Sequence, residues 1–307
     1  MGGWMSEVID YQAQFEAYLL TEKRVSDNTF AAYSRDIRQL FQYLKNRRVR
    51  IEKCAKEHLR NFLKVLKEQG VSAKSLSRKI SAMKLFYVFL KERYQLPNVA
   101  GALTFPTIEK KLPNYLSEEE VQQLLIAAHY DTSYRGIRNK IMLYLLYASG
   151  VRVSELVSMS VDQLHFDSGF VHVVGKGKKE RVIPLPKNLL DLLRYYLDHV
   201  YPKLLPGQSD FKTNYLFFSV YKNVVKPMSR QFFWQVLKKI LMQAGITRNV
   251  SPHSLRHSLA THLLKNGADI RSLQMLLGHE NLSTVQVYTH LSNPQLREVY
   301  DKKHPRA

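Results

Sequence analysis

The chain has 307 residues, which is enough for two domains, and its 45% hydrophobic content allows each domain to bury a core, so the composition excludes a disordered chain. A formal net charge of +20 favours a polyanionic partner, and basic residues outnumber acidic ones both in 1–107 and in 108–307, as expected if both parts contact one nucleic acid. The single cysteine, Cys54, excludes an intramolecular disulfide and a cysteine-rich metal site.

Localisation follows from the same composition. No apolar run approaches the roughly 20 residues needed to span a bilayer, and the N-terminus has no secretory pattern. With one cysteine, the chain fits a reducing compartment. We expect a cytoplasmic protein without membrane insertion.

Four amphipathic helices are predicted in residues 6–95, where apolar residues recur at helical spacing. Their apolar faces run through Val8–Leu19, Phe30–Leu44, Leu59–Leu66 and Leu76–Leu90. Gly70 closes the third helix and Ser72 caps the fourth. Short connections between neighbours favour a helical bundle.

The polar faces of this bundle are basic. A solvated surface is the alternative interpretation, but acidic residues are scarce beside these positions, which favours contact with DNA phosphates. The candidate DNA-binding residues are Arg35, Arg38, Arg47, Arg48, Lys74, Arg78 and Lys84.

A linker is predicted over 96–115, where prolines interrupt any periodicity, and a second domain over 116–307. Ser117 and Glu120 form the pattern of a capping box that opens its first helix. The apolar run Ile141–Ala148 predicts a buried helix that ends at Gly150, so Arg152 follows a rigid element.

The rest of the second domain is predicted to be mostly helical, with a small antiparallel β-sheet. Segments Phe170–Val174 and Arg181–Leu185 alternate around a glycine-flanked lysine, Lys176, and predict a hairpin. Leu216–Val220 is a candidate third strand. Helices are expected over Leu189–Val200, Arg230–Ala244 and Gln295–Tyr300. The fold class is therefore mainly α.

Residues 251–290 hold the densest set of chemically capable side chains. His253 and Arg256 stand three apart at the start of a predicted helix, a second helix ends at Gly278 before His279, and Tyr288 follows. Each has a structural interpretation on its own, as a packing imidazole or a half-buried phenol, and the same holds for His257 and His262.

Taken in order, these motifs resemble the tyrosine recombinase (phage integrase) family. His-x-x-Arg, Leu-Gly-His and the tyrosine are similar to its C-terminal signature. Ala148–Leu156 resembles its first arginine motif, and Gly175–Arg181 its lysine-bearing hairpin turn. The similarity covers nearly the whole chain, which implies a SAM-like core-binding domain at 6–95. The similarity is strongest to recombinases of the XerC/XerD type.

The resemblance also implies an active site. Two guanidinium forks can bind the non-bridging oxygens of a phosphate, in a geometry that lysine does not reproduce. In the family pattern, the tyrosine is the nucleophile, His253 the general base, His279 a hydrogen-bond donor and Lys176 the general acid, with Lys178 and Lys179 as rivals. The candidate catalytic residues are Arg152, Lys176, His253, Arg256, His279 and Tyr288.

The implied function is cofactor-independent cleavage and rejoining of DNA through a 3′-phosphotyrosyl link, with resolution of chromosome dimers at a dif-like site. Its partners would be double-stranded DNA, a XerC-like recombinase in a heterotetramer or further copies of this chain in a tetramer, and a DNA translocase of the FtsK type. A mobile-element integrase, a type IB topoisomerase and a non-enzymatic DNA-binding regulator are alternatives.

Two further expectations concern metal and assembly. Zinc ligation by His253, His257 and His279 is a weaker alternative, because the cationic Arg256 lies among them. No metal or cofactor is expected. The apolar residues of the C-terminal segment must be buried somewhere, either on their own domain or, as the resemblance implies, on a neighbouring subunit. Removing residues 293–307 would then weaken cooperative assembly.

Overall fold

A computed structural model describes residues 10–107, 115–175, 180–206, 213–222, 224–278 and 300–305. The chain divides into two compact units, Met1–Lys110 and Lys111–Ala307, and each has its own hydrophobic core. Within the described ranges, none of the helices combines the length and the apolar character that crossing a membrane requires.

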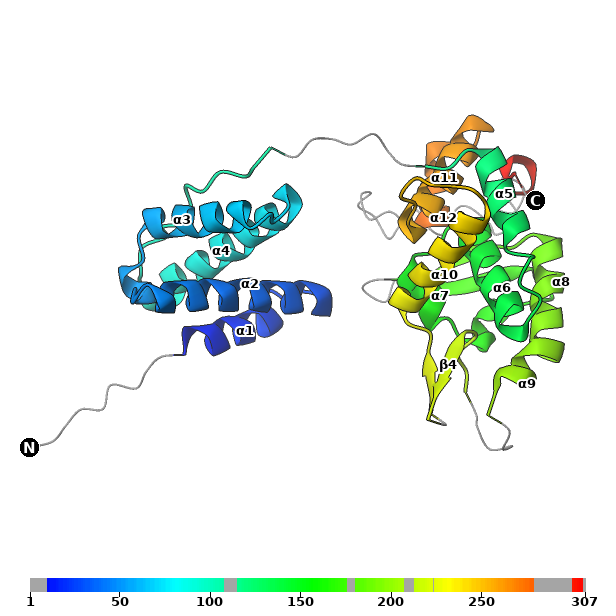
Figure 1. Ribbon diagram of the computed structural model, residues 1–307, viewed down its shortest axis with the longest axis horizontal. Helices are drawn as coiled ribbons and strands as arrows, with labels where there is room; N and C mark the ends of the chain where they lie inside the picture. The colour runs from blue at the N-terminus through cyan, green and yellow to red at the C-terminus, as the bar shows by residue number, and fades with distance from the viewer. Residues whose placement is uncertain are drawn as a thin grey trace, which may run out of the picture. The chain divides into compact units, whose positions relative to one another are not determined.

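The first unit is a bundle of four helices, as the sequence predicts (Figure 1). The helices are α1 (Tyr11–Thr21), α2 (Asp27–Asn46), α3 (Lys56–Glu68) and α4 (Ala73–Tyr94), with a short 3-10 turn η1 (Ile51–Lys53) before α3. Ser72 caps α4 by accepting a hydrogen bond from the Ser75 amide. Gly70 ends the α3 region with a φ of +81°, a conformation that glycine adopts without strain.

The first unit extends further along the chain than the predicted linker start at residue 96. Ala100 is fully buried and Leu103 is 4% exposed, and both pack in the core of the bundle. The segment lacks helical periodicity, so the sequence pattern gives no sign of this burial.

The second unit is mostly helical. Its helices are α5 (Glu118–Ala127), α6 (Tyr134–Ser149), α7 (Val153–Ser158), α8 (Lys187–Tyr195), α9 (Tyr201–Leu204), α10 (Arg230–Gln243), α11 (Pro252–Lys265) and α12 (Ile270–Leu277), with a 3-10 turn η2 (Val161–Gln163) and a π-helical turn η4 (Tyr196–Val200). The predicted capping box is present, since Ser117 accepts from the Glu120 amide and Glu120 accepts from the Ser117 amide.

Two small antiparallel sheets accompany these helices. Strands β1 (Leu164–His165), β2 (Phe170–Val174) and β3 (Glu180–Pro184) pair in that order, and the β2–β3 hairpin is the predicted one. A strand forms where Leu216–Val220 predicts one, but it does not join the first sheet. β4 (Phe218–Tyr221) pairs with β5 (Val224–Pro227) in a separate sheet, and β1 completes the first sheet. A strand of two residues is too short for an alternating pattern to reveal it.

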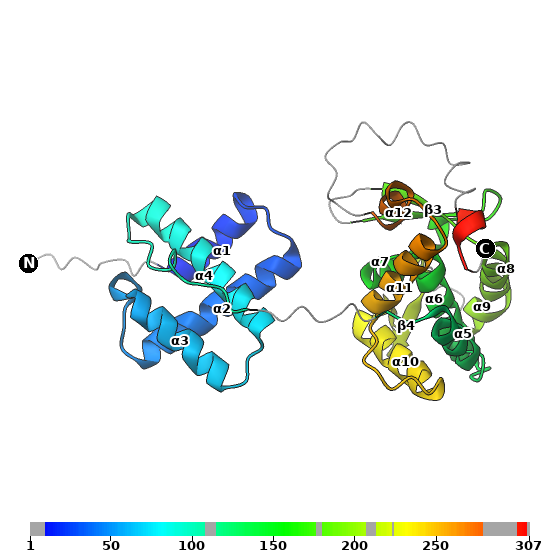
Figure 2. The ribbon, with the colours of Figure 1, turned by 90° about the horizontal axis from the view of Figure 1, so that it is seen from above.

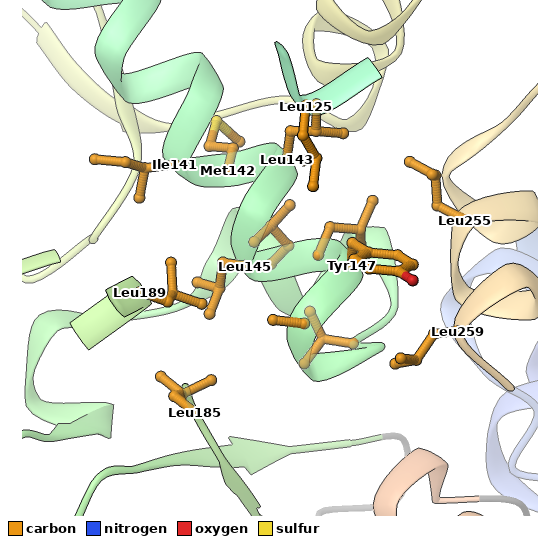
Figure 3. Close-up of a cluster of buried hydrophobic side chains, with 14 of the residues drawn as sticks. Leu125, Ile141, Met142, Leu143, Leu145, Tyr147, Leu185, Leu189, Leu255 and Leu259 are labelled. Atoms are coloured by element: carbon orange, nitrogen blue, oxygen red, sulfur yellow. The ribbon is translucent and has the colours of Figure 1, made fainter. Parts of the chain in front are cut away.

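Helix α6 is at the centre of the second unit. Figure 3 shows Leu143 and Tyr147 of α6 among side chains from other elements, with Leu255 and Leu259 of α11 facing them. Leu143, Leu255 and Leu259 are at most 1% exposed. This packing fixes the position of α6, which ends just before Arg152, and of α11, which carries Arg256.

The C-terminal residues dock on their own unit. Residues 300–303 are helical, and Tyr300 is 2% exposed within the core. Its hydroxyl donates to the Ala148 carbonyl at 3.1 Å, and its ring stacks on His304. The described part of the segment therefore packs on its own unit, and exchange with a neighbouring subunit stays a prediction. Most of the predicted final helix, Gln295–Tyr300, lies outside the described residues.

Candidate active site

Arg152 occupies the turn between two helices. Helix α6 ends at Gly150, which has a φ of +59°, and Arg152 is the residue before α7. Its Nη1 donates to Glu155 Oε1 at 2.9 Å and its Nη2 to the Gly278 carbonyl at 3.0 Å. The side chain is 38% exposed, and the other donors of its fork have no partner among the described residues. Arg152 is therefore fixed at one edge and open at the other.

Arg256 lies deeper, on the second turn of α11, and is 4% exposed. Its Nη1 donates to the Gly150 carbonyl and its Nη2 to the Leu277 carbonyl. The added Cβ of any larger residue at Gly150 would lie 2.7 Å from Leu277 Cδ2 and 2.8 Å from Leu259 Cδ2. The glycine thus serves both the left-handed turn and the close approach of α11 and α12.

Glu155 is the buried anion of this region, with 6% of its side chain exposed. Burial by itself raises the pKa of a carboxyl group, but the hydrogen bonds and charge of Arg181 and the bonds from Arg152 outweigh it, and the pKa of Glu155 lies below its ordinary value. Glu155 is therefore ionised at neutral pH.

Arg181 is a further residue of this region, at the end of the Gly175–Arg181 motif, in which the sequence singles out only the lysines. It lies in β3 opposite Val173. Its Nη1 and Nη2 donate to the two oxygens of Glu155 at 3.1 and 2.6 Å, and its Nε donates to the Leu276 carbonyl at 3.2 Å. An arginine beside a glycine-rich turn carries no signal of such a role, because charged residues are usual there.

The C-terminal end of α12 joins these groups. The carbonyls of Leu276, Leu277 and Gly278 accept from Arg181, Arg256 and Arg152 respectively. Figure 2 shows α12 beside β3, and the two elements are in contact. The last carbonyls of a helix lack intrahelical partners and carry partial negative charge, so they suit cations. This helix end is the base of an arginine cluster.

The cluster, formed by Arg152, Arg181, Arg256 and Glu155, has an excess of positive charge. Three guanidiniums surround one carboxylate within the described ranges. Burial, followed by the charges of the other two arginines, lowers the pKa of Arg256 to about 10, and Glu155 opposes this shift. The guanidinium still remains protonated at neutral pH. An anion at the exposed edge would therefore relieve repulsion inside the cluster.

The remaining candidate catalytic residues divide into two groups. His253 is exposed on the first turn of α11, one turn before Arg256, where Ser251 caps the helix by accepting from the Ser254 amide. Lys176, His279 and Tyr288 lie outside the described residues, so the weaker zinc alternative, which includes His279, stays untested. The structure brings Arg152 and Arg256 together at α12.

Two other side chains of this region have structural roles. His262 is 1% exposed, its Nε2 lies 2.9 Å from the Leu116 carbonyl, and its Nδ1 lies 2.9 Å from the Tyr147 hydroxyl. It is the packing imidazole that the sequence suggests. Tyr300, the next tyrosine in the chain after Tyr288, has its hydroxyl buried against the Ala148 carbonyl.

The candidate DNA-binding residues of the first unit have different environments. Five of them are exposed: Arg35, Arg38, Arg47, Arg48 and Lys74. Arg38 also lies 3.9 Å from Glu16. Lys84 lies over the Phe105 ring. Arg78 pairs with the buried Asp36, which also binds Lys79, so the charge of Arg78 is partly used within the bundle.

Comparison with known proteins gives consistent results over both units. The phage integrase family model matches residues 114–294, and the N-terminal SAM-like domain of phage integrases matches residues 13–94. Tyrosine recombinase XerD of Staphylococcus haemolyticus is 40% identical over 296 residues, covering 96% of this chain and 98% of the relative. Tyrosine recombinase XerD of Oceanobacillus iheyensis is also 40% identical over 296 residues, with 95% and 97% covered.

A solved structure supports the fold. The XerH site-specific recombinase, crystallised with its difH substrate before cleavage, superposes with a TM-score of 0.68 at 21% identity, over 94% of this chain and 83% of that one. At this identity the likeness concerns the fold. Together with the family models and the full-length relatives, it leads to one assignment: the chain belongs to the phage integrase family and is a tyrosine recombinase.

Proposed function

We propose that this recombinase cleaves and rejoins double-stranded DNA at a dif-like site and thereby resolves chromosome dimers during segregation. The arginine cluster at the end of α12 carries the proposal, because its excess positive charge lies where Arg152 is open to an anion. The full-length similarity to chains named XerD supports this function over that of a mobile-element integrase.

The reaction needs a nucleophile, stabilisation of charge on the phosphorane-like transition state, and a proton for the leaving oxygen. Tyr288 attacks the phosphorus and forms the 3′-phosphotyrosyl ester as the bond to the 5′-oxygen breaks. Arg152 and Arg256 stabilise the non-bridging oxygens. Attack by a free 5′-hydroxyl reverses these steps, so the ester conserves the bond energy and no cofactor is needed.

The three remaining groups handle protons and hydrogen bonds. His253 accepts the phenolic proton of Tyr288, and its exposure at the start of α11 suits a group that meets substrate. His279 donates a hydrogen bond to the phosphate, and Lys176 protonates the departing 5′-oxygen. The sequence places His279 directly after Gly278, whose carbonyl binds Arg152.

Both units contribute to DNA binding. The exposed basic residues of the bundle, Arg35, Arg38, Arg47, Arg48 and Lys74, contact phosphates. Lys84 and Arg78 lie at the margin, because each is half-buried and has a partner inside the unit. The active assembly is a tetramer, built with a XerC-like recombinase or with further copies of this chain. A DNA translocase of the FtsK type acts on this tetramer.

A nicked duplex that bears candidate sites tests the function. Cleavage next to the nick releases a short strand and traps the covalent adduct, which is measured on a denaturing gel. An adduct with the native chain and none with Tyr288→Phe supports the proposal. Relaxation of supercoiled plasmid without any such site would favour the topoisomerase alternative, and binding without an adduct would favour the regulator.

A further inference from the structure

Arg181 donates hydrogen bonds both to Glu155 and to the Leu276 carbonyl at the end of α12. We propose that Arg181 is a positioning residue for strand cleavage, which places Arg152 through Glu155 and holds the end of α12 through the Leu276 carbonyl. The inference rests on the proposed function, because it takes Arg152 as a group that binds the scissile phosphate.

All three nitrogens of the Arg181 guanidinium are bonded to protein. Two bind Glu155 and the third binds the Leu276 carbonyl, and the side chain is 9% exposed. The side chain of Arg152, by contrast, is 38% exposed. Arg181 is thus placed to hold other groups, while Arg152 is placed to meet the substrate.

The carboxylate of Glu155 links Arg181 to Arg152. Oε1 accepts from Arg181 Nη1 at 3.1 Å and from Arg152 Nη1 at 2.9 Å. Oε2 accepts from Arg181 Nη2 at 2.6 Å and from the Arg152 amide at 2.8 Å. Four bonds fix both the position and the plane of the carboxylate. Without the fork of Arg181, Glu155 could rotate towards Arg152 and neutralise the charge that a phosphate needs.

Arg181 also joins two elements next to proposed catalytic residues. It is the second residue of β3, in the hairpin whose connecting residues include Lys176. A Cβ added at Gly278 would lie 3.2 Å from Arg181 Cδ, so the side chain packs directly against the residue that precedes His279. One side chain therefore ties the hairpin to the end of α12.

The test uses Arg181→Lys, which keeps a positive charge beside Glu155 but loses the fork and the bond to Leu276. Arg194→Lys is the matched control, because Arg194 pairs with Asp191 at the surface of the same unit. Single-turnover cleavage of a nicked duplex and the dissociation constant for the duplex are measured in the native and Arg152→Lys backgrounds, at a temperature where every variant is folded.

Arg181→Lys is expected to slow cleavage about 10- to 100-fold while the dissociation constant changes less than about 3-fold. In the Arg152→Lys background the same change is expected to slow cleavage by less than about 3-fold, because the group that Arg181 positions is already gone. A merely structural role would give equal losses in both backgrounds. Arg194→Lys is expected to be native in rate.

Two results would overturn the inference: a native cleavage rate for Arg181→Lys, or equal slowing in both backgrounds. If Arg181→Lys does not fold, Glu155→Gln tests the same link from the other side, with the same expected dependence on Arg152. A native rate for Arg152→Lys alone would instead contradict the phosphate clamp of the proposed function. The two failures are therefore distinguishable.

Discussion

Arg181 and Glu155 form a two-point ion pair, with N–O distances of 3.1 and 2.6 Å and side chains that are 9% and 6% exposed. Removing one partner of a buried pair leaves an uncompensated charge, which costs about 3–5 kcal/mol. Glu155→Ala leaves the arginines of the cluster without their carboxylate. We expect it to lower the free energy of unfolding by about this amount in urea denaturation.

The surface supplies the control for this prediction. Asp191 pairs with Arg194 at 3.2 Å, but its side chain is 58% exposed. Asp191→Ala is expected to change the free energy of unfolding by less than about 1 kcal/mol, because water screens such pairs. Equal effects of Glu155→Ala and Asp191→Ala would contradict the structural role of the buried pair.

The same carboxylate predicts a pH dependence. The folded-state pKa of Glu155 lies below its ordinary value of 4.5, because its bonds to Arg181 and Arg152 outweigh burial. A lowered pKa contributes stability that is present above the unfolded-state pKa and is lost as the pH falls through the folded-state value. The difference in unfolding free energy between the native chain and Glu155→Gln is expected to shrink as the pH falls below about 4.5. A constant difference from pH 6 to pH 3 would contradict this assignment.

The two arginine motifs predict different results for the same substitution. Arg152→Lys is expected to cost about 2–4 kcal/mol of transition-state stabilisation, because a point charge replaces a planar fork. The unfolding free energy of the Arg152→Lys variant should change little, since the Arg152 side chain is 38% exposed. Arg256→Lys should lose activity and also stability, because Arg256 is buried and binds the Gly150 and Leu277 carbonyls. Single-turnover cleavage and urea denaturation of both variants separate the two effects.

The structure gives a matched control for the nucleophile. Tyr288→Phe is expected to abolish adduct formation while DNA binding stays within a few-fold, since charge dominates the affinity. Tyr300→Phe should cleave at the native rate, because its hydroxyl is buried against the Ala148 carbonyl. Denaturing gels and gel shifts measure both outcomes. Adduct formation by Tyr288→Phe would transfer the nucleophile assignment to another residue.

Local patterns in the sequence account for most of the fold. Apolar spacing predicted the four helices of the bundle, and the glycine at 150 predicted where α6 ends. The pairing of β4 with β5 and the burial of Ala100 and Leu103 were missed, because both depend on contacts that leave no periodic pattern. Sequence order alone determines neither strand partners nor tertiary burial.

The candidate site shows the same division. The motifs predicted Arg152 and Arg256 as candidates, and the structure brings these two arginines together at the end of α12. Glu155 and Arg181 lie inside the same two motifs, but their contacts depend on the convergence of α7, β3 and the end of α12. Carbonyl groups at a helix end have no side-chain signature. The sequence therefore could not predict that the carbonyls of Leu276, Leu277 and Gly278 accept from the three arginines.

The last prediction concerns the C-terminal residues, which the family resemblance assigned to a neighbouring subunit. In this chain Tyr300 is 2% exposed and His304 is 6% exposed, and the Tyr300 hydroxyl donates to Ala148, at the end of α6. Removing a large buried aromatic ring costs about 3–5 kcal/mol, and removing one hydrogen bond costs about 1 kcal/mol. Tyr300→Ala is expected to lower the unfolding free energy by about 3–5 kcal/mol, and Tyr300→Phe by about 1 kcal/mol.

Concentration separates docking within one chain from exchange between subunits. The measurement is made where sedimentation shows the chain to be monomeric, so that any loss reports contacts inside one subunit. Deleting residues 300–307 should then destabilise the second unit at least as much as Tyr300→Ala does, because it also removes the His304 ring that stacks on Tyr300. The opposite result would be a truncation that leaves the unfolding free energy of the monomer unchanged and weakens only cooperative assembly on DNA. That result would support exchange of the C-terminal residues between subunits.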